Sequence, residues 1–189
     1  MPLIERANSV LVVVDVQDTF LCKLPLHERE ALVARIAWIM QVAIALEIPI
    51  VATAEDVSDT VELLPLLKNL LPPGQCVFNK MVFSLYGQHD IRQAIEALGK
   101  TDVVLVGQET DVCIAQSAID LRDAGYQVWV ADDATASPWP HHDAGLRRME
   151  NGGVVISNIK GIYYEWVRDV STAIAIGKTV TSVPPDLTL

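Results

Sequence analysis

The sequence predicts a three-layer α/β/α fold, with a doubly wound and mostly parallel sheet of six strands between two layers of helices. Short runs rich in β-branched residues alternate with longer amphipathic stretches along the chain, a pattern typical of βαβ units. The short runs are continuously apolar, which indicates strands buried on both faces. A chain of 189 residues fits one substantial core, so we expect a single domain over residues 1–189.

Six short apolar runs are predicted as strands because β-branched residues are frequent in them. In chain order they cover residues 9–14, 48–53, 75–79, 102–106, 127–131 and 153–156. For a doubly wound sheet of six strands we expect the order 3-2-1-4-5-6, in which strands one and four are neighbours at the point where the order reverses.

The stretches between these strands show the apolar spacing of helices. They cover residues 28–46, 90–98, 111–124 and 142–151, with a shorter helical piece over residues 61–67. Gly99, Gly125 and Gly152 follow three of these stretches, where a helix C-cap favours glycine. The tail over residues 179–189 is apolar enough that we expect it to pack on the domain or on a neighbouring subunit.

Charge and composition limit the classes of partner. The chain has 24 Asp and Glu against 14 Lys and Arg, a formal net charge of -10, and no basic cluster interleaved with aromatic residues. We therefore expect no binding to nucleic acid or to a membrane. The N-terminus does not resemble a signal peptide and no apolar run reaches membrane-spanning length, which predicts a cytoplasmic location. Because 51% of the residues are hydrophobic, we expect a homo-oligomer.

Cysteine and histidine spacing argue against a metal or disulfide framework. Cys22, Cys76 and Cys113 are odd in number and form no CxxC pair, which leaves at least one thiol free. The four histidines show no spacing typical of metal ligands. We expect no metal and no other cofactor.

Three residues with chemically useful side chains lie where predicted strands end. Asp15 ends the first run, Lys80 ends the third, and Cys113 follows the fourth at the start of a helical stretch. Ligands of open α/β sheets bind beyond the carboxyl ends of the strands, near the reversal of strand order. Adjacent strands lie about 5 Å apart, so Asp15 and Cys113 should be neighbours, and Lys80 should reach them from about 10 Å away.

These residue types suit nucleophilic catalysis. A carboxylate beside a thiol can remove its proton and later donate it to a leaving amine, and an ammonium group orients the pair and favours the thiolate. The first turn of a helix favours negative charge, so we expect Cys113 to ionise readily. The structural alternatives are a turn residue at Asp15, a surface charge at Lys80 and a small buried side chain at Cys113.

Longer motifs surround all three residues. They read VVVDVQDTF at 12–20, NK at 79–80 with FS at 83–84, VGQETDVCI at 106–114, DLRDAGYQV at 120–128, DDATAS at 132–137 and GLRRM at 145–149. In this order, and over most of the chain, they resemble the isochorismatase-like cysteine hydrolase superfamily. Together the motifs are specific, although any one of them alone is weak.

The resemblance implies a catalytic triad in which Asp15 is the general base and acid, Lys80 its electrostatic partner and Cys113 the nucleophile. It also implies a cis peptide bond between Gln108 and Glu109, and an oxyanion hole made by the backbone N–H groups of Glu109 and Cys113. The expected reaction is hydrolysis of a C–N bond in a small amide-type substrate through a thioester intermediate. Aromatic and polar residues near the motifs are candidates for the substrate pocket: Gln17, Phe20, Phe83, Tyr86 and Trp139.

The chain departs from parts of the family's pattern. Nicotinamidases of the superfamily carry an Asp-x-His metal motif after the second strand, where this chain reads TAED at residues 53–56, which argues against nicotinamide as the substrate. Isochorismatases protonate an enol ether with the aspartate and need no cysteine. Cys113 therefore favours C–N hydrolysis, and enol-ether hydrolysis remains the alternative.

Two further classes stay open. A phosphatase of the haloacid-dehalogenase type carries four motifs that are matched in order by Asp15, Thr53, Lys80 and the pair Asp132-Asp133. That chemistry needs a second carboxylate two residues after the first, where this chain has Gln17. The other class is a non-catalytic protein that retains the fold. A dinucleotide site is disfavoured because the turn after the first strand has no glycine.

Overall fold

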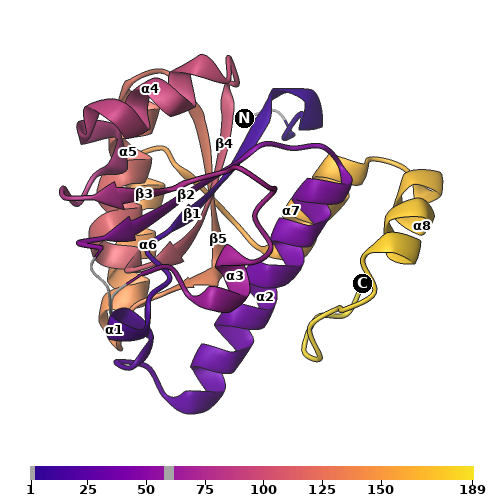
Figure 1. Ribbon diagram of the computed structural model, residues 1–189, viewed down its shortest axis with the longest axis horizontal. Coiled ribbons are helices and arrows are strands. Elements are labelled where there is room, and N and C mark those ends of the chain that lie inside the picture. The colour runs from indigo at the N-terminus through magenta and orange to yellow at the C-terminus, as the bar shows by residue number, and fades with distance from the viewer. Residues whose placement is uncertain (1–2, 58–61) are drawn as a thin grey trace.

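Six parallel strands form one sheet in the computed structural model, which describes residues 3–57 and 62–189 (Figure 1). The strands are β1 (Ser9–Val14), β2 (Ile50–Glu55), β3 (Val77–Lys80), β4 (Asp102–Gln108), β5 (Gln127–Ala136) and β6 (Val155–Ser157). Their order is β3-β2-β1-β4-β5-β6, and each neighbouring pair is parallel. The predicted α/β fold and strand order are confirmed.

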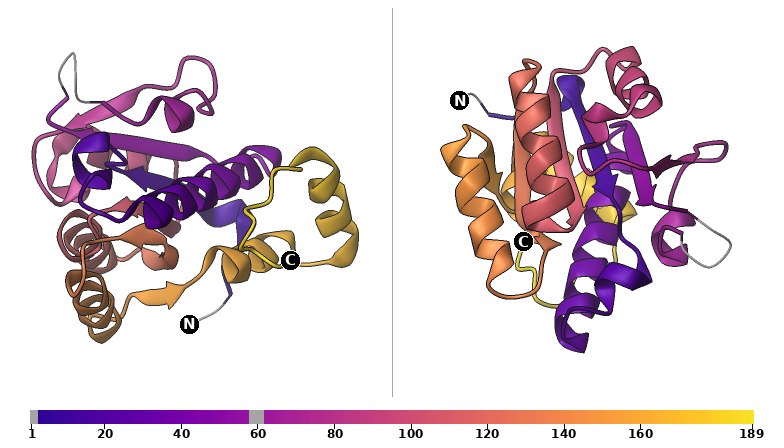
Figure 2. Two further views of the ribbon diagram at one scale, coloured as in Figure 1. Left: turned by 90° about the horizontal axis from the view of Figure 1, so that it is seen from below. Right: turned by 90° about the vertical axis from the view of Figure 1, so that its left-hand side faces the viewer.

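Helices cover both faces of the sheet. One face packs against α2 (Leu26–Ala45) and α7 (Ile159–Val167), and the other against α4 (His89–Ala97), α5 (Ala115–Asp123) and α6 (His141–Asn151). Helices α5 and α6 lie side by side (Figure 2, right), and α8 (Val170–Thr179) packs against α2 and α7 (Figure 1). The shorter segments are η1 (Arg6–Asn8), α1 (Asp18–Leu21), α3 (Pro65–Lys68), η2 (Leu85–Gly87) and η3 (Thr110–Ile114). No helix in the described ranges has the length and apolar character that crossing a bilayer requires.

The central strand β1 explains why the first apolar run does not alternate with polar residues. Leu11 and Val13 pack into the core formed with α2 and α7, whereas Val10, Val12 and Val14 pack into the core formed with α4, α5 and α6. All five side chains are fully buried, and burying one such side chain contributes about 1.5–3 kcal/mol. Burial on both faces therefore fixes β1 at the centre of the sheet.

The carboxyl ends of three strands meet at the reversal of strand order. Val14, the last residue of β1, lies opposite Thr53 of β2 and Gly107 of β4. Gly107 has φ 122°, and a Cβ atom at this position would overlap the carbonyl oxygen of Val14. Glycine is therefore required here for the conformation and for the close approach of the two strands.

Several elements begin or end away from their predicted bounds. Strands β2, β3 and β6 begin two residues later than expected, while β4 and β5 extend to Gln108 and Ala136. The β4–β5 register shifts between Leu105, which pairs with Val130, and Gly107, which pairs with Thr135, so β5 has extra residues at this irregularity.

The helices also differ in part from prediction. The expected helix over residues 111–124 is a π-helical segment, η3, that continues into α5. The predicted helical piece at 61–67 begins at residue 61, outside the described residues, and the structure has a helix, α3, from Pro65. Helices α7 and α8 were not predicted, although the buried positions of α7, residues 159, 162, 163, 166 and 167, recur at helical spacing. In the tail, Val180 is buried and Leu187 packs against the core, as expected.

Candidate active site

Asp15 lies directly after β1 in a left-handed backbone conformation. Its φ is 49°, which costs a residue with a side chain on the order of 1–3 kcal/mol unless the surroundings enforce it. Hydrogen bonds to the neighbouring strand β2 hold Asp15 in this conformation. The Asp15 N–H donates to the Thr53 carbonyl oxygen at 3.1 Å, and the Thr53 hydroxyl donates to Asp15 Oδ1 at 2.7 Å. The carboxylate is fully buried and held from the β2 side.

Lys80 brings the positive charge to this carboxylate. It is the last residue of β3 and is fully buried, and its Nζ lies 2.9 Å from Asp15 Oδ2. The same ammonium group donates to the carbonyl oxygen of Val82 at 2.7 Å and lies 3.5 Å from Cys113 Sγ. The expected convergence of Asp15, Lys80 and Cys113, which are far apart in the chain, is what the structure shows.

Cys113 belongs to the π-helical segment η3, and its side chain is 2% exposed. Such segments are rare and frequently occur at functional sites. Helix α6 packs closely behind it, because a Cβ atom on Gly145 would lie 2.8 Å from the Asp111 Cα atom. The first residue of the segment, Thr110, is also fixed, since its hydroxyl lies 2.9 Å from His142 Nδ1. The nucleophile candidate therefore sits on a rigidly packed support.

Glu55 is a fourth member of the cluster that the sequence analysis did not identify. It ends β2, opposite Lys80 in the β2–β3 register. Its Oε2 lies 3.2 Å from Lys80 Nζ and accepts a hydrogen bond from Cys113 Sγ at 3.3 Å. Its side chain is 25% exposed, whereas those of Asp15 and Lys80 are 0% exposed. The predicted second strand ended at residue 53, so no signal in the sequence indicated that Glu55 would end β2 beside Lys80.

Gln17, a predicted pocket residue, fixes the position of Glu55. Its side-chain amide donates to the Glu55 carbonyl oxygen at 2.9 Å, and its Oε1 accepts from the Glu55 N–H at 2.6 Å. Gln17 is buried, so both of its polar atoms are used by the backbone of Glu55. A phosphatase of the haloacid-dehalogenase type would need a carboxylate at this position. The amide of Gln17 suits the observed pairing instead, because it both donates to and accepts from the Glu55 backbone.

Burial and charge set the protonation of the cluster. Burial raises the pKa of the Asp15 carboxyl even though Lys80 acts in the opposite direction. Burial alone would lower the pKa of the Lys80 ammonium, but the negative charges of Asp15 and Glu55 raise it above its usual value. Burial also raises the pKa of the Cys113 thiol, and Asp15 adds to this increase.

The expectation that Cys113 ionises readily is therefore wrong for the resting site. The helix start and the Lys80 ammonium favour a thiolate, but burial and two nearby carboxylates outweigh them. The resting centre consists of a protonated thiol, a carboxylate with a raised pKa and a charged ammonium group. A thiol in this setting becomes nucleophilic by losing its proton to a neighbouring carboxylate as it attacks.

A metal ion would find three donors in this cluster. One ligand atom from each of Asp15, Glu55 and Cys113 lies within 4.8 Å of the others. However, the Lys80 ammonium lies 2.9 Å from Asp15 and 3.2 Å from Glu55, so the protein's own cation already neutralises these oxygens. The absence of a cofactor stays a prediction.

The turn before η3 has the conformation that the resemblance implies. The peptide bond between Gln108 and Glu109 is cis. The Glu109 carbonyl oxygen accepts from the backbone N–H groups of Val112 and Ile114 at 3.2 and 3.1 Å. The roles of the Glu109 and Cys113 N–H groups as an oxyanion hole stay predictions.

The aromatic pocket candidates occupy different surroundings. Phe20 lies beneath the Lys23 ammonium, which is 4.7 Å from the ring centroid and forms an ion pair with Glu109. Phe83 is largely exposed in the loop after β3. Tyr86 donates to Glu96 of α4 at 2.9 Å and packs against Tyr126 in the turn between α5 and β5, so these contacts do not involve the Asp15 cluster. Their roles in binding stay predictions.

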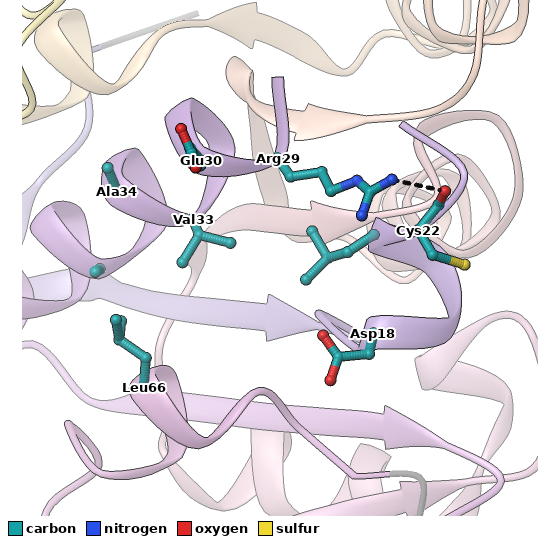
Figure 3. A pocket seen from close by; sticks show the side chains of 9 residues that line it. Asp18, Cys22, Arg29, Glu30, Val33, Ala34 and Leu66 are labelled. Atoms are coloured by element: carbon teal, nitrogen blue, oxygen red, sulfur yellow. Dashed lines mark hydrogen bonds between the residues drawn. The ribbon is translucent and has the colours of Figure 1, made fainter. Parts of the chain in front are cut away.

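Two surface cavities of similar size lie beside the cluster without including it. One has a volume of about 650 Å³ and lies between α1, α2 and α3, with mostly apolar walls; Asp18, Cys22, Val33 and Leu66 line it (Figure 3). The other, about 700 Å³, is more polar and is lined by residues that include Arg35, Asp132, Trp139 and His142. Trp139 is strongly exposed there. In neither cavity does Asp15, Lys80 or Cys113 form part of the wall.

Known proteins match both the sequence and this fold. An isochorismatase domain family model matches residues 9–160. Isochorismatase family protein 2A of Dictyostelium discoideum is 29% identical over 169 residues, which cover 86% of this chain and 84% of the relative. YcaC from Pseudomonas aeruginosa, solved with covalent acrylamide, has a TM-score of 0.87 at 22% identity, covering 97% of this chain and 92% of YcaC.

The YcaC protein of Escherichia coli, described as an octameric hydrolase of unknown specificity, has a TM-score of 0.85 at 19% identity, covering 95% of this chain and 91% of that protein. At this level of identity the solved structures support the fold alone. The family model covers the segments that carry Asp15, Lys80 and Cys113. This chain therefore belongs to the isochorismatase family of hydrolases.

Proposed function

We propose that this protein is a cysteine-dependent hydrolase that cleaves a C–N bond of a small amide-type substrate through a thioester on Cys113. The observation that carries the proposal is the contact of Cys113 Sγ with the buried Asp15–Lys80 ion pair, with Nζ 3.5 Å from the sulfur and 2.9 Å from the carboxylate. A nucleophile beside a base that is oriented by a third group is the usual arrangement for covalent catalysis.

In the proposed first step, Sγ attacks the carbonyl carbon while Asp15 takes the thiol proton. Asp15 is suited to this role because burial raises the pKa of its carboxyl, which makes it a stronger base than an exposed aspartate. Its Oδ2 forms the ion pair with Lys80 but no well-directed hydrogen bond with any described residue. A lone pair therefore remains available for the proton.

In the second step, the tetrahedral intermediate collapses and the amine leaves. Backbone N–H groups at Glu109 and Cys113 would stabilise the oxyanion, a contribution typically of about a hundred- to a thousand-fold in rate for each donor. Asp15 would return its proton to the leaving nitrogen as the C–N bond breaks. Lys80 stays charged throughout, because neighbouring negative groups raise its pKa.

Enol-ether hydrolysis is the alternative reaction on the same site. It would use Asp15 as an acid and leave Cys113 without a role. The contacts of the thiol with Glu55 and the Lys80 ammonium, together with an Asp15 oxygen within 4.8 Å of the sulfur, favour C–N hydrolysis. Any assembly of this chain with further copies is also a proposal, supported by the exposed apolar run Met81, Val82 and Phe83 and by the octameric YcaC relative. Light scattering after size exclusion tests it.

The test of the proposed reaction combines turnover with intact-protein mass spectrometry. After exposure to a library of small amides, the wild-type protein should release amine and carry an acyl group on Cys113. Cys113→Ala should lose both signals, and Cys22→Ala, which changes an exposed thiol, should keep them. Wild-type turnover by Cys113→Ala together with loss by Asp15→Asn would refute the thioester route and leave direct attack of water with Asp15 as base.

A further inference from the structure

Two carboxylates lie beside the same sulfur, but their environments differ. Asp15 is fully buried, with Oδ1 occupied by the Thr53 hydroxyl and Oδ2 by the Lys80 ion pair. Glu55 is 25% exposed and accepts directly from Cys113 Sγ at 3.3 Å. Carboxylates in unlike environments commonly divide the acid and base work of a reaction between them. The difference in exposure indicates which step each one can serve.

Resting on the proposed thioester route, we propose that Glu55 is the general base that activates water to hydrolyse the thioester. The attacking water has to come from the surface, and Glu55 is the carboxylate that joins the surface to the sulfur. Asp15, closed in by β2 and Lys80, serves the earlier step, in which the proton comes from the thiol itself. The two carboxylates thus act in sequence on the same sulfur.

The proposed step balances in atoms and charge. Glu55 takes one proton from water as the water oxygen attacks the thioester carbonyl carbon, and the C–S bond then breaks. The products are the carboxylic acid and a sulfur that regains a proton from Glu55, whose Oε2 lies 3.3 Å away. Lys80, 3.2 Å from Oε2 and 3.5 Å from Sγ, stabilises the sulfur while it is negative. No further reactant is needed.

The local structure holds Glu55 in position for this role. The buried Gln17 amide pairs with both the N–H and the carbonyl oxygen of Glu55, at 2.6 and 2.9 Å. This pairing ties the segment after β1 to the end of β2. A carboxylate whose backbone is fixed in this way keeps its distance to the sulfur, as a general base needs hydrogen-bond reach of the proton that it removes.

The test uses p-nitrophenyl acetate, an activated ester that acylates thiols without needing protonation of its leaving group. In Glu55→Gln the initial burst of nitrophenolate should persist, because acylation does not depend on Glu55. Steady-state turnover should fall by about a hundred- to ten-thousand-fold, the usual contribution of general base catalysis. The proteins compared in this test all carry Cys22→Ala and Cys76→Ala, because these exposed thiols would also be acetylated. Acetylated Cys113 should then accumulate and be visible by intact mass. Glutamine keeps an oxygen that can accept from Lys80, so the cluster geometry is preserved.

A matched control removes the same charge one residue away. Asp56 is exposed, directly follows Glu55 and has φ 47°, a conformation that asparagine tolerates. Asp56→Asn should deacylate at the wild-type rate. Hydroxylamine, which attacks thioesters without a general base, should free the acetylated Glu55→Gln enzyme as fast as the acetylated wild type. After hydroxylamine treatment, Glu55→Gln should give a second burst at the wild-type rate, which a misfolded protein would not give.

Other outcomes count against the proposal in distinguishable ways. Wild-type steady-state turnover by Glu55→Gln would overturn the assignment of Glu55 and leave the thioester route intact. Loss of the burst in Glu55→Gln would overturn it as well, by placing Glu55 in acylation. If neither wild type nor Glu55→Gln ever carries an acetyl group on Cys113, the proposed function fails, and the role of Glu55 fails with it.

Discussion

Replacing Lys80 with methionine should destabilise the protein strongly, because it removes one partner of a fully buried ion pair. Methionine has a similar length and no charge. The change leaves the Asp15 carboxylate buried, with the Thr53 hydroxyl as its remaining side-chain donor. Removing one member of a buried pair typically costs about 3–5 kcal/mol in the free energy of unfolding. For a domain of this size, each kcal/mol lowers the melting temperature by about 2–4 °C.

The structure also predicts an asymmetry between the two partners. In Asp15→Asn, Lys80 retains the Glu55 carboxylate at 3.2 Å and the Val82 carbonyl oxygen at 2.7 Å. Asp15→Asn should therefore cost less than Lys80→Met. The double variant should cost less than the sum of the two single changes by about 0.5–3 kcal/mol, since residues in one buried network are energetically coupled.

Urea unfolding followed by circular dichroism measures these free energies. Lys68→Met is the control, because Lys68 pairs with Glu62 at the surface, where the two side chains are 48% and 47% exposed, and such pairs contribute about 0–1 kcal/mol. A loss below about 1 kcal/mol in Lys80→Met, equal to that of the control, would refute the buried ion pair. Additive costs in the double variant would show that Asp15 and Lys80 do not interact.

Three more outcomes follow from the site. Gly145→Ala should lower the free energy of unfolding by about 1–3 kcal/mol, because the added methyl group overpacks α6 against the π-helical segment. Thermal melting measures this loss, and an unchanged melting temperature would contradict the close packing. Iodoacetamide near neutral pH should label the exposed Cys22 and Cys76 before the buried, protonated Cys113, and peptide mapping measures the order. Faster labelling of Cys113 would mean that the resting sulfur is a thiolate. Burial raises the pKa of Asp15 above its usual 3.8, so hydrolysis should be lost as falling pH protonates this base at a pH above 3.8. A rate that stays constant down to pH 3.8 and falls only below it would contradict the role of Asp15 as base.

The strand order and the meeting of the three candidate residues could be predicted from the sequence. Continuous apolar runs marked the buried strands, and the rule that sites lie at carboxyl ends of parallel strands brought Asp15 and Cys113 together. Lys80 followed from the same rule. These inferences need only the order of the strands along the chain, which the apolar runs show, and the general spacing of strands in a sheet.

Other features depend on contacts that local patterns do not record. Glu55 joins the cluster because the β2–β3 register sets it opposite Lys80, and strand registers cannot be read from one strand alone. The protonated state of Cys113 reflects burial and carboxylates from β1 and β2. The helix start, visible in the sequence, favoured the opposite conclusion. The pairing of the Gln17 amide with the Glu55 backbone depends on the approach of two distant segments, and a role of Gln17 in substrate binding stays a prediction.

The contact between Gly107 and the Val14 carbonyl has a consequence for redesign. The main chains of β1 and β4 touch there, so no side chain can be inserted between the residue that precedes Asp15 and the turn that leads to Cys113. Libraries intended to alter selectivity should leave this junction unchanged and vary the surrounding loops, where backbone can shift without separating the acid from the sulfur.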